Sequence, residues 1–149
     1  SVSCYISNVP LDTSGAALAV AQSGTLTTVT QTLVQLTRRG KTVHYRIKLT
    51  VSNATGAVGN NVILVSLPFA GNAADVASLA VIGEGYLIDN STGFIYPFIA
   101  IFDTGGAAKF IPSAVAGAAP LFLGQTGSGF DDALAANDLI AFSGTYEMI

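Results

Sequence analysis

The chain has 149 residues and a mass of 15.2 kDa, enough for one domain with a single hydrophobic core and too little for two. Half of its residues are hydrophobic and 10% are charged, whereas about a quarter of the residues in an ordinary soluble domain are charged. This composition excludes an intrinsically disordered chain, which needs low hydrophobicity and high net charge. We expect the surplus apolar surface to face other copies of the chain.

The charge and the apolar stretches exclude several kinds of partner. A net charge of −3 at pH 7 and a pI of about 4.7 argue against nucleic acid. The single cysteine, Cys4, excludes a disulfide within the chain, and no Cys/His spacing indicates a zinc site. The longest apolar stretch, residues 110–123, is broken by prolines and a glycine, whereas a membrane-spanning helix needs about 20 apolar residues. We therefore expect no nucleic acid, no membrane insertion, no metal and no cofactor.

Two regions are predicted along the chain. Residues 1–24 are expected to form an N-terminal extension, either a linker or an edge strand, because the apolar run at 16–21 has neither a cap nor a clear period. Residues 25–149 are expected to form the main domain. Apolar runs in this region are short and separated by Gly, Asn, Asp, Ser or Pro, which is typical of all-β domains.

The clearest predicted strand covers residues 43–51, where apolar and polar side chains alternate strictly, so that one face is buried and the other exposed. A Thr- and Val-rich run at 25–36 predicts the preceding strand, with residues 38–41 as the turn between them. Five of the six basic residues fall between positions 38 and 48. This cluster suits either docking to an anionic surface such as acidic polysaccharide or a solvated strand face that prevents edge pairing, and we prefer the second interpretation.

The remaining elements are predicted from short apolar runs between turn residues. A Gly- and Asn-rich loop at 53–61 precedes a strand at 62–65 that is apolar on both faces and is stopped by Pro68. Helical turns are expected at 73–79 and 131–136, with Asp131 as the cap of the second. Further strands are expected at residues 80–88, 94–102, 109–111 and 139–148.

Residues suited to catalysis are few. The one histidine, His44, is predicted on the exposed face of its strand beside Arg46 and Lys48, and no sequence pattern sets a nucleophile and a carboxylate beside it. The nine acidic residues are scattered, so no pair can be assigned across a sugar ring. We therefore predict that the chain is not an enzyme, and a carbohydrate-active enzyme ranks last among the alternatives.

The order of segments resembles the C-terminal head domain of bacteriophage tail fibres and receptor-binding proteins. The matching stretch begins with LTRRGKTV at 36–43 and ends with SLPF at 66–69, and NDLIAFSGTYE at 137–147 is similar to the family's closing strand. The resemblance covers roughly residues 25–149. It implies a jelly-roll-like antiparallel β-sandwich that assembles as a homotrimer at the tip of a virion tail appendage, outside the cell. It implies no catalytic residue.

The function that the resemblance implies is non-enzymatic binding of a saccharide or protein on the host cell surface, with other virion tail proteins as further partners. The alternative is a structural decoration or connector domain of the virion that binds no receptor. Saccharide sites combine aromatic rings with amide and carboxylate acceptors, and we expect these groups in turns. The candidate ligand-binding residues are Asp89, Asn90, Tyr96, Asp103, Phe130 and Asp131.

Overall fold

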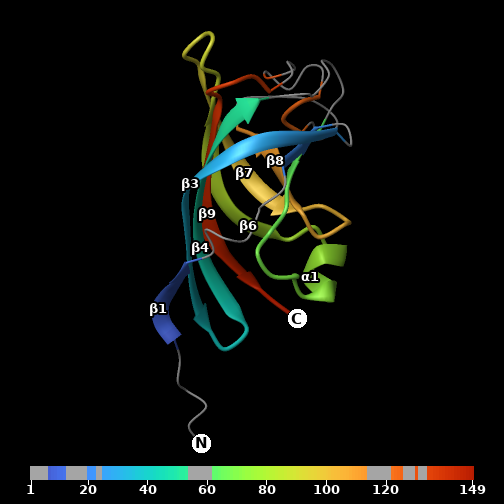
Figure 1. Cartoon of the computed structure of the whole chain (residues 1–149). Helices are drawn as coiled ribbons and strands as arrows, with labels where there is room; N and C mark the ends of the chain where they lie inside the picture. The colour runs from blue at the N-terminus through green and yellow to red at the C-terminus, as the bar shows by residue number, and fades with distance from the viewer. Residues whose placement is uncertain are drawn as a thin grey trace, which may run out of the picture.

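The structure of the chain is a computed structural model. It describes residues 7–12, 20–22, 25–53, 62–113, 122–125, 130 and 134–149, and its side chains are described within 35–52 and at the described positions from 62 onward. Within these ranges the chain is almost entirely β-strand, and the strands curl into one sheet around a packed interior (Figure 1). The predicted all-β class is therefore confirmed.

Every pair of neighbouring strands in the described sheet is antiparallel. In chain order the strands are β1 (Ser7–Asp12), β2 (Val20–Gln22), β3 (Thr25–Arg39), β4 (Thr42–Asn53), β5 (Ile63–Val65), β6 (Val81–Ile88), β7 (Ile95–Phe102), β8 (Ala108–Pro112) and β9 (Leu139–Glu147). The two strands that precede residue 25, β1 and β2, both pair with β3.

The sheet closes on itself. Its strand order is β1-β3-β2-β5-β8-β7-β6-β9-β4, and an additional pairing joins β4 back to β3. The described pairings contain two Greek keys, in each of which three successive strands pair in turn and the fourth returns beside the first. In the first key β5 pairs with β2, and in the second β9 pairs with β6. As a result β9 lies between β4 and β6, two strands that are distant in sequence.

The single helix in the described ranges, α1 (Ala73–Ala77), lies beside the C-terminal end of the chain (Figure 1). It begins at Asn72, whose side-chain oxygen accepts a hydrogen bond from the Ala74 N–H at 2.9 Å. The Asn72 N–H in turn donates to the Glu147 carbonyl at 2.8 Å, which fastens the helix to β9. None of the described residues forms a helix with the length and apolar character needed to cross a membrane.

The predicted strands after residue 40 agree with β4 to β9, and from β5 onward their ends agree to within one residue. The predicted turn at 38–41 is too long, because Arg38 and Arg39 continue β3 and pair with Val43 and Thr42. The hairpin needs only two turn residues, since Gly40 adopts a φ of +62°.

The second predicted helical turn, at 131–136, is wrong in its described part, since residues 134–136 are not helical. The Asp138 carboxylate accepts the Ala135 N–H at 2.8 Å, and Asn137 has a φ of +72°. These two features turn the chain into β9 instead of continuing a helix. The predicted cap, Asp131, lies outside the described residues.

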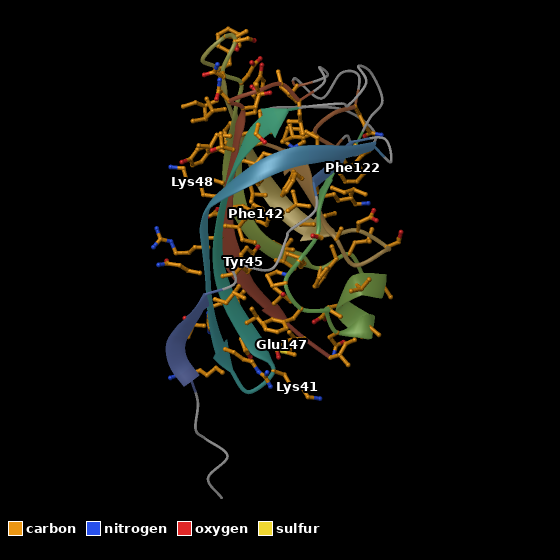
Figure 2. All side chains as sticks on the ribbon, viewed as in Figure 1. Lys41, Tyr45, Lys48, Phe122, Phe142 and Glu147 are labelled. Atoms are coloured by element: carbon orange, nitrogen blue, oxygen red, sulfur yellow. The ribbon has the colours of Figure 1, made fainter. Side chains whose placement is uncertain are left out.

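Aromatic side chains from the inner face of the sheet form the centre of the core. The Phe142 ring lies 5.5 Å from the Tyr45 ring, centroid to centroid (Figure 2). The Phe142 ring also lies 5.1 Å from the Phe110 ring. The Tyr45 hydroxyl is buried and donates to the Ile82 carbonyl at 2.9 Å. Burial raises the pKa of the Tyr45 phenol well above its ordinary value, so the hydroxyl stays protonated and remains a donor.

The rings of the core have room because β6 carries glycine at two neighbouring inward positions. A Cβ atom at Gly85 would overlap the Ala141 carbonyl oxygen and the backbone of Phe142 on β9. A Cβ atom at Gly83 would lie 2.6 Å from the Tyr45 hydroxyl oxygen. These glycines therefore allow β6 and β9 to approach closely while the aromatic side chains fill the interior.

We expect Gly85→Ala to lower the free energy of unfolding by roughly 1–3 kcal/mol, because the added methyl group must displace the backbone of β9. Urea denaturation followed by circular dichroism measures the change. Gly105→Ala is the matched control, since a Cβ there would meet its nearest neighbour, Asp103 Oδ2, at an ordinary 3.5 Å. Equal stability of the two variants would contradict the close approach of β6 and β9.

Candidate functional site

Asp89 and Asn90 lie in the β6–β7 turn, at the opposite end of the sheet from the β3–β4 turn (Figure 1). The Asp89 side chain points into this turn, where its Oδ1 accepts the Ser91 N–H at 2.9 Å and the Ser91 hydroxyl at 2.7 Å. The Asn90 N–H donates to the Asp138 carboxylate at 2.9 Å, which ties the turn to the start of β9. The Asp89 carboxylate therefore stabilises the turn. Because the residue is only 5% exposed, it offers little surface to a ligand.

Tyr96 and Phe130 are brought together, with ring centroids 5.5 Å apart in an edge-to-face arrangement. The contact belongs to the core, because Phe130 is 2% exposed and its ring faces are covered. Phe130 therefore offers no open surface for stacking against a sugar. Asp131, the neighbouring candidate, lies outside the described residues.

Asp103 lies at the far end of β7 from the Asp89 turn, roughly 25 Å away for a strand of this length. Its Oδ1 lies 3.4 Å from the Lys109 Nζ, and its Oδ2 accepts the Gly105 N–H at 3.2 Å. The Lys109 ammonium also lies 4.2 Å from the centre of the Phe122 ring. The candidate residues therefore occupy two ends of the molecule and do not converge on one site.

A hollow of about 630 Å³ lies between α1 and the turn that follows β7. Its walls include Leu67, Phe69 and Val76, with Thr104 and glycines of the turn at the rim. Of the described residues that line it, none carries a charge. This hollow has few polar groups that could orient a polar ligand.

A shallow groove of about 340 Å³ lies on the outer face of the sheet, above β9 and between β4 and β6. Arg46 and Lys48 of β4 form one wall, and Glu84 and Tyr86 of β6 form the other. Lys48 lies on the side of the sheet turned away from α1 (Figure 2). Tyr86 is 38% exposed, so its ring is open to a ligand.

The register of the sheet explains the shape of the groove. The outward positions form two rows across β4, β9 and β6, which are Arg46–Ser143–Glu84 and Lys48–Ala141–Tyr86. In each row a small side chain on β9 stands between two long ones on its neighbours. The small residues form the floor of the groove and the long ones its walls. We call this set of six residues the outer groove.

The local sequence pattern does not identify the outer groove as a site. The basic cluster at 38–48 suits either docking to an anionic surface or a solvated strand face, with the second preferred, and Glu84, Tyr86 and Ser143 are not among the candidate ligand-binding residues. The alternation of GEGYLI at residues 83–88 does place Glu84 and Tyr86 on one face of a strand. The sequence pattern of a single strand does not show that β9 pairs with both β4 and β6. This pairing brings the six residues together.

Among the described residues, no group of three or more His, Cys, Asp or Glu side chains lies close enough to hold a metal ion. Comparison with protein-family models, with curated proteins and with solved structures gives no match. Function is therefore inferred from the chemistry of the chain's own surface.

The lowered pKa of the Asp89 carboxyl predicts that the stability of the fold depends on pH. Burial raises the pKa of the Asp89 carboxyl, but hydrogen bonds from Ser91 and Thr92 outweigh burial, and the pKa lies below the ordinary 3.8. A carboxyl whose pKa is lower in the folded state contributes stability above its unfolded pKa, and this contribution is lost as pH falls through the folded pKa. We expect Asp89→Asn to be less stable than the wild type by roughly 1 kcal/mol at pH 7, with the difference shrinking below about pH 4.

Urea denaturation at pH 7, 5, 4 and 3 measures this difference. Glu84→Gln serves as the control, because Glu84 is exposed on the outer face of the sheet. A difference between wild type and Asp89→Asn that is constant over the whole pH range would contradict the role of the Asp89 carboxylate in the turn.

Proposed function

We propose that the chain is a non-enzymatic receptor-binding head domain, of the kind found at the tip of a bacteriophage tail fibre, which binds a saccharide or protein on the host cell surface. The observation that carries the proposal is the outer groove, which sets two cations, a carboxylate and an exposed tyrosine ring on a hydrogen-bonded sheet face. Such side chains on rigid strands suit recognition of a polar ligand.

The chemistry of the groove favours binding over catalysis. Among the described residues that line it, Glu84 is the one carboxylate, whereas hydrolysis of a glycosidic bond ordinarily uses two. His44 lies in the next row of the same face, and its Nδ1 is 3.0 Å from the Thr145 hydroxyl. A nucleophilic triad would instead need that nitrogen to be held by a carboxylate. A carbohydrate-active enzyme therefore remains the weakest alternative.

The proposal includes assembly as a homotrimer. Support comes from an apolar strip on the outer face of the sheet, in which Ile95 of β7 pairs with Ile88 of β6, Ile99 of β7 pairs with Ile111 of β8, and Pro97 lies between Ile95 and Ile99. Ile95 is 61% exposed and Ile99 is 42% exposed. Contiguous exposed apolar residues of this kind mark an interaction surface. Closed cyclic symmetry would bury the strip on every copy, with a gain of about 25 cal/mol per Å² of apolar area.

The proposal also includes the finer description of the fold as a jelly-roll-like β-sandwich. Support comes from the two Greek keys of the described sheet, since double-sheet jelly rolls are built from eight strands in two such keys. Placement at the tip of a virion tail appendage, with other tail proteins as partners, follows from the resemblance of the sequence to that family.

A structural decoration or connector domain of the virion is the second candidate function. The apolar strip favours it as much as it favours a receptor-binding head, because both need an assembled domain. The outer groove favours the receptor-binding head, since its cations, carboxylate and exposed tyrosine ring suit a polar ligand.

We expect the chain in solution to have three times its mass of 15.2 kDa, measured by light scattering coupled to size exclusion. The double variant Ile95→Lys/Ile99→Lys should lower the mass to that of one chain, because charges would then occupy the apolar strip. Ile149→Lys is the control, since Ile149 is 71% exposed outside the strip. A monomeric wild type would contradict the proposed assembly.

We expect the fluorescently labelled chain to bind saturably to cells of at least one strain in a panel of bacteria. The double variant Arg46→Ala/Tyr86→Ala should weaken this binding at least tenfold, because it removes a cation and the ring of the outer groove. Lys41→Ala removes a cation outside the groove and should bind as the wild type does. Absence of saturable binding across the panel would instead support the structural function.

A further inference from the structure

We infer that the outer groove takes an acidic saccharide, that is, a sugar bearing a carboxylate. This inference rests on the proposed receptor-binding function and names the chemical class of its ligand. It is carried by the arrangement of Arg46 and Lys48 on one wall, Tyr86 and Glu84 on the other, and small residues between them.

The wall on β4 supplies the site for the carboxylate. Arg46 and Lys48 are two residues apart on one strand, so they face the same side with Cα atoms roughly 7 Å apart. The Arg46 Nη1 donates to the side-chain oxygen of Gln35 on the neighbouring strand β3 at 3.4 Å, which engages one of the five N–H donors of the guanidinium. A guanidinium binds a carboxylate through two parallel hydrogen bonds, and an ammonium beside it adds a second charge-assisted contact.

The wall on β6 supplies the site for the sugar ring. Tyr86 lies across Ala141 from Lys48, two strand spacings or about 10 Å away between Cα atoms. The methyl side chain of Ala141 leaves that interval open, so a ring that lies over it meets the exposed face of Tyr86. Aromatic faces bury the apolar C–H face of a ligand while its hydroxyls stay hydrogen-bonded.

Glu84 favours one orientation of the bound saccharide in the outer groove. Glu84 lies opposite Arg46 across Ser143, and its carboxylate repels a negatively charged group and accepts hydrogen bonds from hydroxyl groups. The carboxylate of the sugar should therefore point toward β4 and its hydroxyls toward β6, with the Ser143 hydroxyl between them. A neutral saccharide would offer no carboxylate to the Arg46 guanidinium, whereas a polyanion without hydroxyls would donate no hydrogen bond to Glu84.

The attraction is local, because the chain as a whole is acidic. Five of the six basic residues lie between positions 38 and 48, while the net charge is −3. An acidic saccharide is thus drawn to the face of β4 and repelled elsewhere, which favours one orientation of docking.

The test uses the full chain and calorimetric titration with oligosaccharides of galacturonic, glucuronic and sialic acid, each matched with a neutral oligosaccharide of the same length. We expect at least one acidic member to bind tenfold or more tightly than its neutral counterpart, and the preference to weaken as sodium chloride is raised. Arg46→Gln and Lys48→Gln should abolish the preference, whereas Tyr86→Ala should weaken binding of acidic and neutral forms alike. Lys41→Gln is the charge-matched control and should leave the preference unchanged.

Two results would overturn the inference. The first is binding to bacterial cells without preference for any acidic oligosaccharide, which leaves the receptor-binding function intact and rejects the ligand class. The second is an acidic preference that survives both Arg46→Gln and Lys48→Gln, which places the ligand outside the groove. Binding of acidic oligosaccharides that Arg46→Gln abolishes, in a chain that binds no cells, would uphold the ligand class and reject the receptor-binding function.

Discussion

The pairing of β9 with both β4 and β6 is the interaction on which the rest of the structure depends. On the inner side it places Phe142 against Tyr45, whose hydroxyl reaches the Ile82 carbonyl of β6. On the outer side the same pairing places small β9 residues between the cations of β4 and the Glu84 and Tyr86 walls of β6. The same backbone hydrogen bonds therefore position the core on the inner side of the sheet and the groove on its outer side. The inward glycines of β6 allow β6 and β9 to approach closely enough to form these hydrogen bonds.

Because side chains alternate along each strand, the inner and outer faces of the sheet have different roles. Inward residues stabilise the domain through aromatic contacts and a buried hydroxyl, and outward residues remain available for a ligand or for other subunits. A site built on paired strands holds its side chains more precisely than a site built on loops. The acidic side chains of the turns have a structural role. The carboxylates of Asp89, Asp103 and Asp138 accept hydrogen bonds from backbone N–H groups and stabilise the conformation of the turns.

Local pattern predicted the strands well and the site poorly, for a physical reason. Period-two alternation is a property of one strand, so β4 and the later strands could be found from neighbouring residues alone. The predicted turn at 38–41 is too long, because Arg38 and Arg39 pair within the hairpin. The candidate ligand residues are carboxylate, amide and aromatic side chains in predicted turns, where residues are often exposed, yet Asp89 and Phe130 are buried. The outer groove depends on register between strands far apart in sequence, which no local pattern contains.

Chemical-shift mapping by nuclear magnetic resonance, during titration of the full chain with galacturonic, glucuronic and sialic acid oligosaccharides in turn, tests the central claim most directly. The largest changes are expected at the backbone amides of Arg46 to Lys48 on β4, Glu84 to Tyr86 on β6, and Ala141 to Ser143 on β9. The strand β9 lies between β4 and β6 and brings these three segments together. Changes confined to the β6–β7 turn or to the hollow beside α1 would contradict the central claim, as would a spectrum that does not change at all.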